Sequence, residues 1–239
     1  MGGNFVYRKN MTIIISIETA TEVCSVALHN GSELLGLCEV DQERSHSKAL
    51  AGMIKQIVSE SGLSLRDLGA VAISQGPGSY TGLRIGTASA KGLCFALDIP
   101  LIAVSTLKGM AQGVTSLQKH STWLCPMIDA RRMEVYCWLS DSDLIEIQAE
   151  QAKVISVNSF EKELNEHPIL FFGSGMAKSQ DLLGKNSNAV FVEGVKPSAR
   201  FIGELAGHKF LTSDFVDLAY FKPRYLKEFH TTQPKTRII

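Results

Sequence analysis

The sequence predicts an α/β fold built from two similar lobes. Its length of 239 residues allows one or two domains. Apolar residues make up 45% and charged residues 20%, which is typical of a chain with a packed core and not of a disordered or coiled-coil protein. One order of elements, three strands followed by strands that alternate with helices, occurs twice. This order indicates a mixed sheet with helices on both faces in each lobe, and a cleft between the lobes.

The first copy of this order spans residues 12–108, the predicted first lobe. Its strands are apolar and rich in β-branched residues, whereas its helices repeat apolar residues every three or four positions. Gly62 is expected to end the first helix, and Ser105 to cap the last. The predicted strands are 12–18, 23–29, 34–40, 70–74 and 100–104, and the predicted helices are 47–61, 81–97 and 105–117.

The second copy spans residues 109–222, the predicted second lobe. It opens with a hairpin that turns at 129–132, and Ser198 is expected to cap its last helix. The predicted strands are 123–128, 133–139, 144–150, 169–172 and 189–192, with helices near 159–165, after Gly175 and after Ser198. Residues 1–11 are expected to be an N-terminal extension, and 223–239 a basic tail.

Charge and cysteine content narrow the classes of function. The 24 basic and 24 acidic residues give a formal net charge of zero, which argues against tight nucleic-acid binding by the chain alone. No apolar stretch approaches the roughly 18 residues that cross a bilayer, and no signal peptide is recognisable. The five cysteines form no C-x-x-C pair and lie among apolar neighbours, as reduced core thiols do. We therefore expect a cytoplasmic protein without membrane contact.

A glycine-rich segment joins the strand at 70–74 to the helix at 81–97. Its sequence, SQGPGSYTGLRIG, supplies flexible backbone, a proline and a hydroxyl that can cap the helix. Such a loop either presents N–H groups to an anion or forms a tight corner, and it lacks the G-K-[ST] of a P-loop. The candidate residues of this loop are Gly76, Pro77, Gly78, Ser79, Thr81 and Arg84.

Small residues recur every four positions along the same helix, at Gly82, Gly86 and Ala90. Glycine inside a helix costs about 1 kcal/mol relative to alanine, so its repeated use needs a reason. A stripe of small residues lets another helix approach closely. That helix is either the one at 47–61 or one from another subunit.

Seven segments resemble the TsaB (YeaZ) family, in the same order and over nearly all of 12–227. They are residues 15–28, 46–50, 76–86, 104–107, 128–136, 197–199 and 223–227. The resemblance, with the duplicated order of elements, implies two ribonuclease-H-like lobes of the actin, sugar-kinase and Hsp70 superfamily. It also implies a role in placing threonylcarbamoyl on the adenosine next to the tRNA anticodon.

The resemblance implies partners and a surface for them. TsaB proteins form a heterodimer with the catalytic paralogue TsaD through the helices that correspond to 47–61 and 81–97. TsaE is the ATPase of this system, TsaC supplies threonylcarbamoyl-adenylate, and contact with tRNA is indirect. The isolated chain is expected to form a homodimer through the same face. The expected interface residues are His46, Leu50, Ile54, Ile57, Gly82, Gly86 and Ala90.

The resemblance also implies that the chain is not an enzyme on its own. TsaD holds a metal with an H-x-x-x-H pair, in which one helical turn brings two imidazoles to one ion. Here the matching positions are His46 and Leu50, and leucine cannot bind a metal. We therefore expect no metal site and no catalytic residue. The alternative of a glycoprotease-like metallo-hydrolase would need a second ligand.

Another alternative is an ATP-binding kinase or ATPase that uses the cleft, or ADP or ATP bound within the assembled complex. In the superfamily, turns at the corresponding positions approach metal, phosphate and adenosine. The same turns could equally be tight structural corners. The candidate residues for nucleotide binding are Glu18, Thr19, Asp129, Arg131, Gly173 and Gly175.

The C-terminal residues 222–239 carry five basic residues against one acidic residue. They could lie along tRNA phosphates in a complex or form a solvated terminus.

Overall fold

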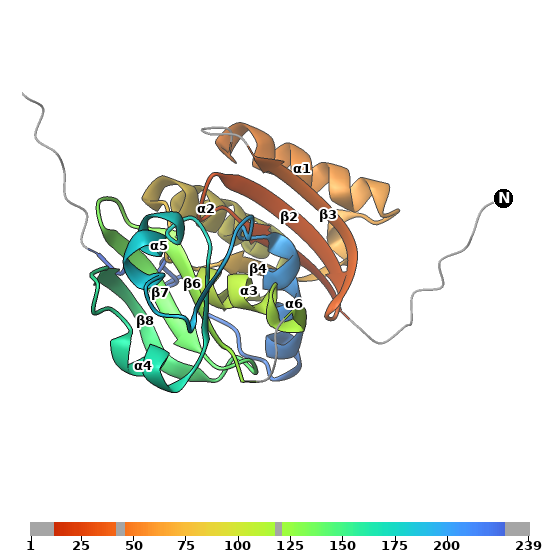
Figure 1. Cartoon of the computed structure of the whole chain (residues 1–239). Helices are drawn as coiled ribbons and strands as arrows, with labels where there is room; N and C mark the ends of the chain where they lie inside the picture. The colour runs from red at the N-terminus through yellow and green to blue at the C-terminus, as the bar shows by residue number, and fades with distance from the viewer. Residues whose placement is uncertain (1–11, 42–45, 118–120, 228–239) are drawn as a thin grey trace, which may run out of the picture.

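The computed structural model describes residues 12–41, 46–117 and 121–227. The expected N-terminal extension and residues 228–239 of the expected tail lie outside the described residues. Within them, the structure confirms two mixed sheets with flanking helices (Figure 1).

The first sheet has five strands in the order β3-β2-β1-β4-β5. The first three pair as antiparallel neighbours, and β4 and β5 continue the sheet in parallel with β1. This pattern follows from the short turns after β1 and β2 and the helical crossovers after β3 and β4. The strands are β1 (Ile13–Glu18), β2 (Val23–Asn30), β3 (Glu33–Asp41), β4 (Leu68–Ser74) and β5 (Leu101–Val104).

The second sheet repeats this topology, with the order β10-β9-β6-β7-β8. Its first three strands are antiparallel neighbours, and β9 and β10 run parallel to β6. The strands are β6 (Trp123–Asp129), β7 (Glu134–Ser140), β8 (Glu146–Val154), β9 (Ile169–Phe172) and β10 (Ala189–Val192). The duplication predicted from the sequence is thus confirmed strand by strand.

Four helices cover the outer faces of the two sheets. α1 (His46–Glu60) and α2 (Tyr80–Leu97) pack on the first sheet, and α4 (Glu161–Glu166) and α5 (Ala177–Leu183) on the second. Two short 3-10 turns, η1 (Leu65–Asp67) and η2 (Thr115–Leu117), join elements within the chain.

The remaining two helices lie between the sheets, and each covers the sheet of the other half of the chain (Figure 1). α3 (Thr106–Gln112) packs on β6 and β7, whereas α6 (Ala199–Leu211) packs on all strands of the first sheet. Gly109 lets them meet, because a Cβ there would lie 2.8 Å from Ile202 Cδ1. The predicted lobe boundary between residues 108 and 109 divides the chain in sequence order, and it therefore assigns α6 to the second lobe. The packing corrects this, because the apolar face of α6 is buried on the first sheet.

The chain after α6 crosses from the first lobe to the second, and we call residues 214–227 the C-terminal strap. Val216 bridges to Leu101 in β5, and the Arg224 N–H donates to the Gln75 carbonyl at 2.7 Å. Farther on, Lys227 forms an ion pair with Glu134 in β7. Residues 223–227 are therefore anchored to both lobes, which corrects the expectation of a solvated tail for this part.

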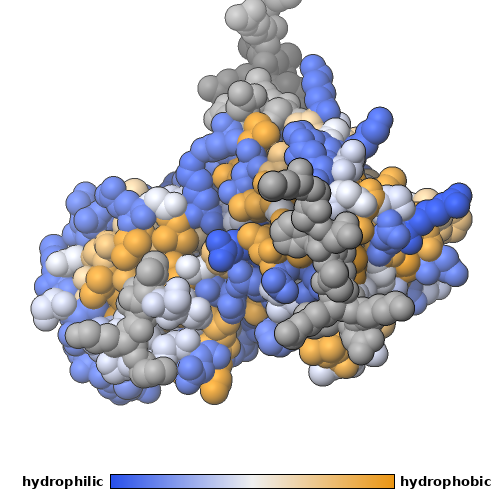
Figure 2. All heavy atoms as spheres, turned by 90° about the vertical axis from the view of Figure 1, so that its right-hand side faces the viewer, coloured by the Kyte–Doolittle hydropathy of each residue, from blue (hydrophilic) through white to orange (hydrophobic). Residues whose placement is uncertain are grey.

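The outer surface carries apolar side chains in separate patches. Figure 2 shows the side on which β3 lies, where apolar atoms are divided by hydrophilic ones. Within the described residues, no helix is both long enough and apolar enough to cross a membrane.

Candidate functional site

The turn between β1 and β2 holds the first candidate group, the carboxylate of Glu18. This side chain is fully buried, and its Oε1 accepts hydrogen bonds from Ser74 Oγ at 2.8 Å and the Ala20 N–H at 2.6 Å. Burial raises the pKa of Glu18 to about 7, and these hydrogen bonds lower it only in part. Its other oxygen, Oε2, has no hydrogen-bond partner among the described residues.

Glycines of the glycine-rich loop and of α2 lie directly against this turn. A Cβ at Gly78 would lie 2.3 Å from the Ala20 carbonyl oxygen, and one at Gly82 would lie 2.1 Å from the Thr19 carbonyl oxygen. The Thr19 side chain is buried as well and donates a hydrogen bond to the Gly82 carbonyl. The glycines thus serve close packing of backbone against backbone.

This packing corrects the nucleotide-binding prediction for Glu18 and Thr19. Both side chains are enclosed by the first lobe itself, so neither can reach a phosphate or a metal ion in this arrangement. It also decides between the two interpretations of the glycine-rich loop, which forms a tight corner. Ser79 caps α2 as predicted, since its Oγ accepts from the Gly82 N–H at 3.3 Å. Gly76 and Pro77 are buried in the corner, while Thr81 and Arg84 are exposed.

The seven predicted interface residues all face inward, which corrects that prediction. Leu50, Ile54 and Ile57 belong to the hydrophobic core under α1, and His46 Nε2 lies 3.3 Å from the Val23 carbonyl oxygen. The stripe of small residues on α2 packs on the first lobe's own turn and sheet. A Cβ at Gly86, for example, would lie 2.3 Å from Thr19 Oγ1. The buried members of this stripe are Gly82, Gly86 and Ala90.

The outward faces of α1 and α2 carry a second set of small residues. Among the described residues there is open space at Gly52 and Gly92, where an added Cβ would meet nothing within 4 Å. Beside Gly92 lies Phe95, whose side chain is 85% exposed. We call the exposed residues Ala51, Gly52, Ala88, Gly92 and Phe95 the outer helix face.

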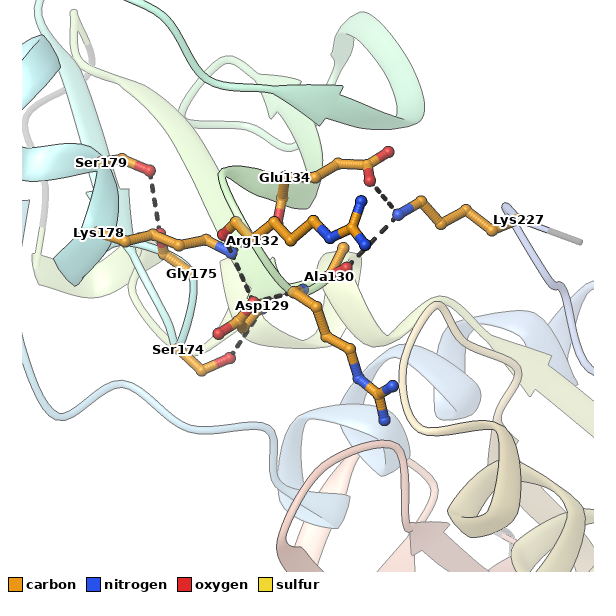
Figure 3. A network of polar contacts seen from close by, with 10 residues as sticks. Asp129, Ala130, Arg132, Glu134, Ser174, Gly175, Lys178, Ser179 and Lys227 are labelled. Atoms are coloured by element: carbon orange, nitrogen blue, oxygen red, sulfur yellow. Dashed lines mark hydrogen bonds and ion pairs between the residues drawn. The ribbon is translucent and has the colours of Figure 1, made fainter. Parts of the chain in front are cut away.

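In the second lobe, the turn between β6 and β7 is held by two lysines that approach it from opposite sides (Figure 3). Lys178 Nζ donates to Asp129 Oδ1 at 2.5 Å and to the carbonyl oxygens of Arg132 and Glu134 at 2.8 and 2.6 Å. Lys227 contacts the Glu134 carboxylate. Partial burial alone would raise the pKa of Asp129, but the hydrogen bonds and charges of Lys178 and Arg131 lower it overall.

Gly173 and Gly175 pack tightly against neighbouring strands, and their role at an adenosine stays a prediction. A Cβ at Gly173 would lie 2.4 Å from the Met127 carbonyl oxygen, and one at Gly175 would lie 2.8 Å from Val135 Cγ1. Of the six predicted nucleotide residues, only Asp129 and Arg131 are exposed. Asp129 already binds Lys178, so the six residues do not form one site.

Other groups in the described chain were not anticipated. Two surface pockets, of about 410 and 260 Å³, lie at the α4–α5 side of the second lobe and beside β3. No group of three or more His, Cys, Asp or Glu side chains within the described residues could hold a metal ion. The contacts of Lys178 and Lys227 with the β6–β7 turn were not predicted, because each lysine meets its partners across more than forty residues of sequence. Phe95 could have been found as an apolar residue out of phase with the buried face of α2.

The fold defines a two-lobed α/β protein in which each lobe is a five-stranded mixed sheet with flanking helices. Residues 36–220 match the family model described as TsaD: tRNA N6-adenosine threonylcarbamoyltransferase. The chain is 32% identical to the tRNA threonylcarbamoyladenosine biosynthesis protein TsaB of Haemophilus influenzae, over 92% of this chain and 94% of that protein. It is 34% identical to TsaB of Escherichia coli, over 90% and 94%. The chain belongs to the TsaB (YeaZ) family.

A solved structure agrees with this assignment. A Pseudomonas aeruginosa protein described as similar to peptidase YeaZ superposes with a TM-score of 0.81 at 26% identity. The superposition covers 91% of this chain and all of that one. The resemblance noted in the sequence is therefore confirmed.

Proposed function

We propose that this chain is a non-catalytic subunit of tRNA threonylcarbamoyladenosine biosynthesis that forms a heterodimer with a TsaD-type paralogue. The names of its TsaB relatives support the role in this modification. The match to the TsaD family model supports descent from a common two-lobed ancestor, and so a partnership between paralogues.

The observation that carries the non-catalytic role is the filled turn of the first lobe. Glu18 and Thr19 occupy the position from which this superfamily is expected to approach metal and phosphate, and both are buried behind glycines of the loop and α2. Because the Glu18 carboxylate is buried and its pKa is raised, it is a poor ligand for a metal ion. The chain therefore contributes surface rather than chemistry.

The outer helix face is the surface that we assign to the partner. Ala51, Gly52, Ala88 and Gly92 allow close approach of a second pair of helices, because all four residues are small and exposed. Phe95 supplies an exposed aromatic group of the kind that anchors interfaces. In the absence of the paralogue, a second copy of this chain would occupy the same face, which gives a homodimer.

The test is co-expression with the TsaD-type paralogue, followed by a tRNA modification assay with and without this chain. The chain alone should modify no tRNA and turn over no ATP, but it should restore modification to its partners. Size-exclusion chromatography should show that a complex with one copy of each protein replaces the homodimer of this chain. Steady ATP turnover by the lone chain would instead favour a kinase or ATPase, and undiminished modification without it would remove the proposed role. Omitting TsaE or nucleotide from the assay would show whether either acts through this complex.

A further inference from the structure

We propose that a basic and aromatic band across the two lobes binds the phosphates of tRNA. The band consists of Tyr80, Arg84, Arg131, Arg132 and Tyr225, all of which are exposed. This inference rests on the proposed function and adds the surface by which this subunit touches the RNA.

The first part of the band lies on α2 and the strap. Arg84 Nη1 donates to the Tyr80 hydroxyl at 2.8 Å, and its guanidinium lies 5.4 Å from the centre of that ring. The Tyr80 ring meets Tyr225 with 5.0 Å between centroids and an angle of 38° between planes. Two tyrosines and an arginine thus form one cluster at the start of α2.

The strap carries the band onward to the second lobe. Two residues beyond Tyr225, Lys227 Nζ approaches the Ala130 carbonyl oxygen at 3.4 Å and forms an ion pair with Glu134. Ala130 immediately precedes Arg131 and Arg132 in the β6–β7 turn (Figure 3). The strap therefore links the tyrosine cluster to the arginine turn through Lys227.

Both arginines have a backbone conformation that is unfavourable for a residue with a Cβ. Their φ angles are 70° at Arg131 and 52° at Arg132, and left-handed arginines are uncommon. Lys178 holds this conformation by its bonds to Asp129 and to two carbonyl oxygens of the turn. Such maintained strain is found most often at functional positions.

The acidic groups beside the arginines are already occupied. Asp129 accepts from Lys178 and from the Arg131 N–H, and Glu134 accepts from Lys227. Neither guanidinium of Arg131 and Arg132 has a hydrogen-bond or ion-pair partner in the part of the chain that the structure describes. Both guanidinium groups therefore remain open to a ligand at the exposed tip of the turn.

This chemistry fits the backbone of a nucleic acid. Guanidinium groups bind phosphates through paired N–H donors, and exposed tyrosine rings can stack on unpaired bases. A free nucleotide would need an enclosing pocket, and the pockets of 410 and 260 Å³ are lined by other residues. An open band that crosses two lobes instead matches an extended strand. Since the whole chain is neutral, we expect binding that adds to the affinity of a partner and not tight binding by this chain alone.

The test replaces both arginines by asparagine, Arg131→Asn with Arg132→Asn, because asparagine tolerates a positive φ. A matched control, Lys162→Gln with Lys185→Gln, removes two exposed charges elsewhere in the second lobe. The heterodimer with the paralogue is titrated with an unmodified tRNA transcript at several salt concentrations, with fluorescence anisotropy as the readout. We expect affinity about tenfold lower for the asparagine variant, and a salt dependence reduced by about one to two phosphate contacts. The control should bind as the wild type does.

Equal tRNA affinity of the asparagine variant and the wild type, with both folded and both heterodimeric, would overturn the proposal. A loss of ATP binding with unchanged tRNA binding would also overturn it, since the arginines would then serve a nucleotide. If the wild-type chain forms no heterodimer, the proposed function fails. The same comparison on the chain alone at low salt then decides whether the band binds RNA.

Discussion

Ser74 Oγ donates a hydrogen bond of 2.8 Å to Glu18 Oε1 and thereby joins the ends of two neighbouring parallel strands. The same oxygen accepts the Ala20 N–H, so one carboxylate oxygen organises the turn that supports α2. The other oxygen is buried without a partner among the described residues. An ionised Glu18 is therefore held at a cost to stability, and this cost depends on pH.

Glu18 should make the protein less stable as the pH rises toward neutrality. Its pKa is 4.5 for an ordinary glutamate and about 7 in the folded chain, so its contribution to stability is fully present below pH 4.5 and is lost as the pH rises through 7. Glu18→Gln should remove this dependence and raise the free energy of unfolding at pH 8 by about 1–3 kcal/mol. Urea unfolding at pH 5.5 and pH 8 measures the effect. Glu33→Gln, at an exposed position of β3, is the control, and an identical pH dependence in wild type and Glu18→Gln would contradict the assignment.

Two glycines of α2 should respond to alanine with opposite signs. Gly82→Ala places a methyl group 2.1 Å from the Thr19 carbonyl oxygen and should lower the free energy of unfolding by about 1–3 kcal/mol. Gly92→Ala meets open space and should raise it by about 1 kcal/mol through helix propensity. Thermal or urea unfolding of the two variants measures both changes in the free energy of unfolding. Effects of equal sign would mean that the inward and outward faces of α2 are wrongly assigned.

Phe95→Ser should weaken the heterodimer without weakening the fold. Its side chain is 85% exposed in the single chain, so the melting temperature should stay unchanged, whereas affinity for the TsaD-type paralogue should fall at least tenfold. Calorimetric titration measures the affinity. Leu211→Ser, at the equally exposed end of α6, is the matched control, with a side chain that is 79% exposed. A similar loss in both variants would indicate a general effect of surface hydrophobicity.

The ion pair between Arg224 and Glu150 should contribute more to the stability of the fold than an exposed ion pair does. Arg224 Nη1 lies 2.8 Å from Glu150 Oε2, and the glutamate side chain is only 2% exposed. Arg224→Gln would leave this carboxylate buried without its partner and should destabilise the protein by about 1–3 kcal/mol, given that the arginine itself is half-exposed. Lys196→Gln, whose partner Asp41 is exposed, should cost less than about 1 kcal/mol. Restored stability in Arg224→Gln with Glu150→Gln would confirm the cause, and equal effects of the two single changes would refute it.

The sequence predicted the order and number of strands because each strand pattern is local. Apolar runs, turn residues and caps such as Ser79, Ser105 and Ser198 all lie within a few residues of what they determine. The exchange of α3 and α6 was not predictable in this way. An apolar helix face shows that a helix is buried, but it does not show which sheet it covers.

Local sequence patterns also do not show which side chains meet in the folded chain, and this explains the wrong predictions at the candidate site. Spacing revealed that α2 carries small residues, yet only the structure shows that Gly82 and Gly86 make room for Thr19 while Gly92 faces outward. The link from Lys178 to Asp129 joins residues 49 positions apart, and such pairs leave no local signal. The family resemblance indicated which helices form the expected interface. Which face of each helix is exposed follows only from the structure.

The crossing of α3 and α6 has a practical consequence for dissecting the protein. A fragment ending at residue 108 would retain the first sheet but lose α6, uncovering the apolar side chains of Ile14 and Ile102. The complementary fragment would lose Leu107, which belongs to the apolar cluster of Trp138, and Lys108, whose Nζ lies 5.0 Å from the centre of the Trp138 ring. Neither half should be obtainable as an independently folding domain, whereas mixing the two fragments could reconstitute the whole. Truncation is thus the wrong tool for separating the contributions of the lobes, and point substitutions in the intact chain are the right one.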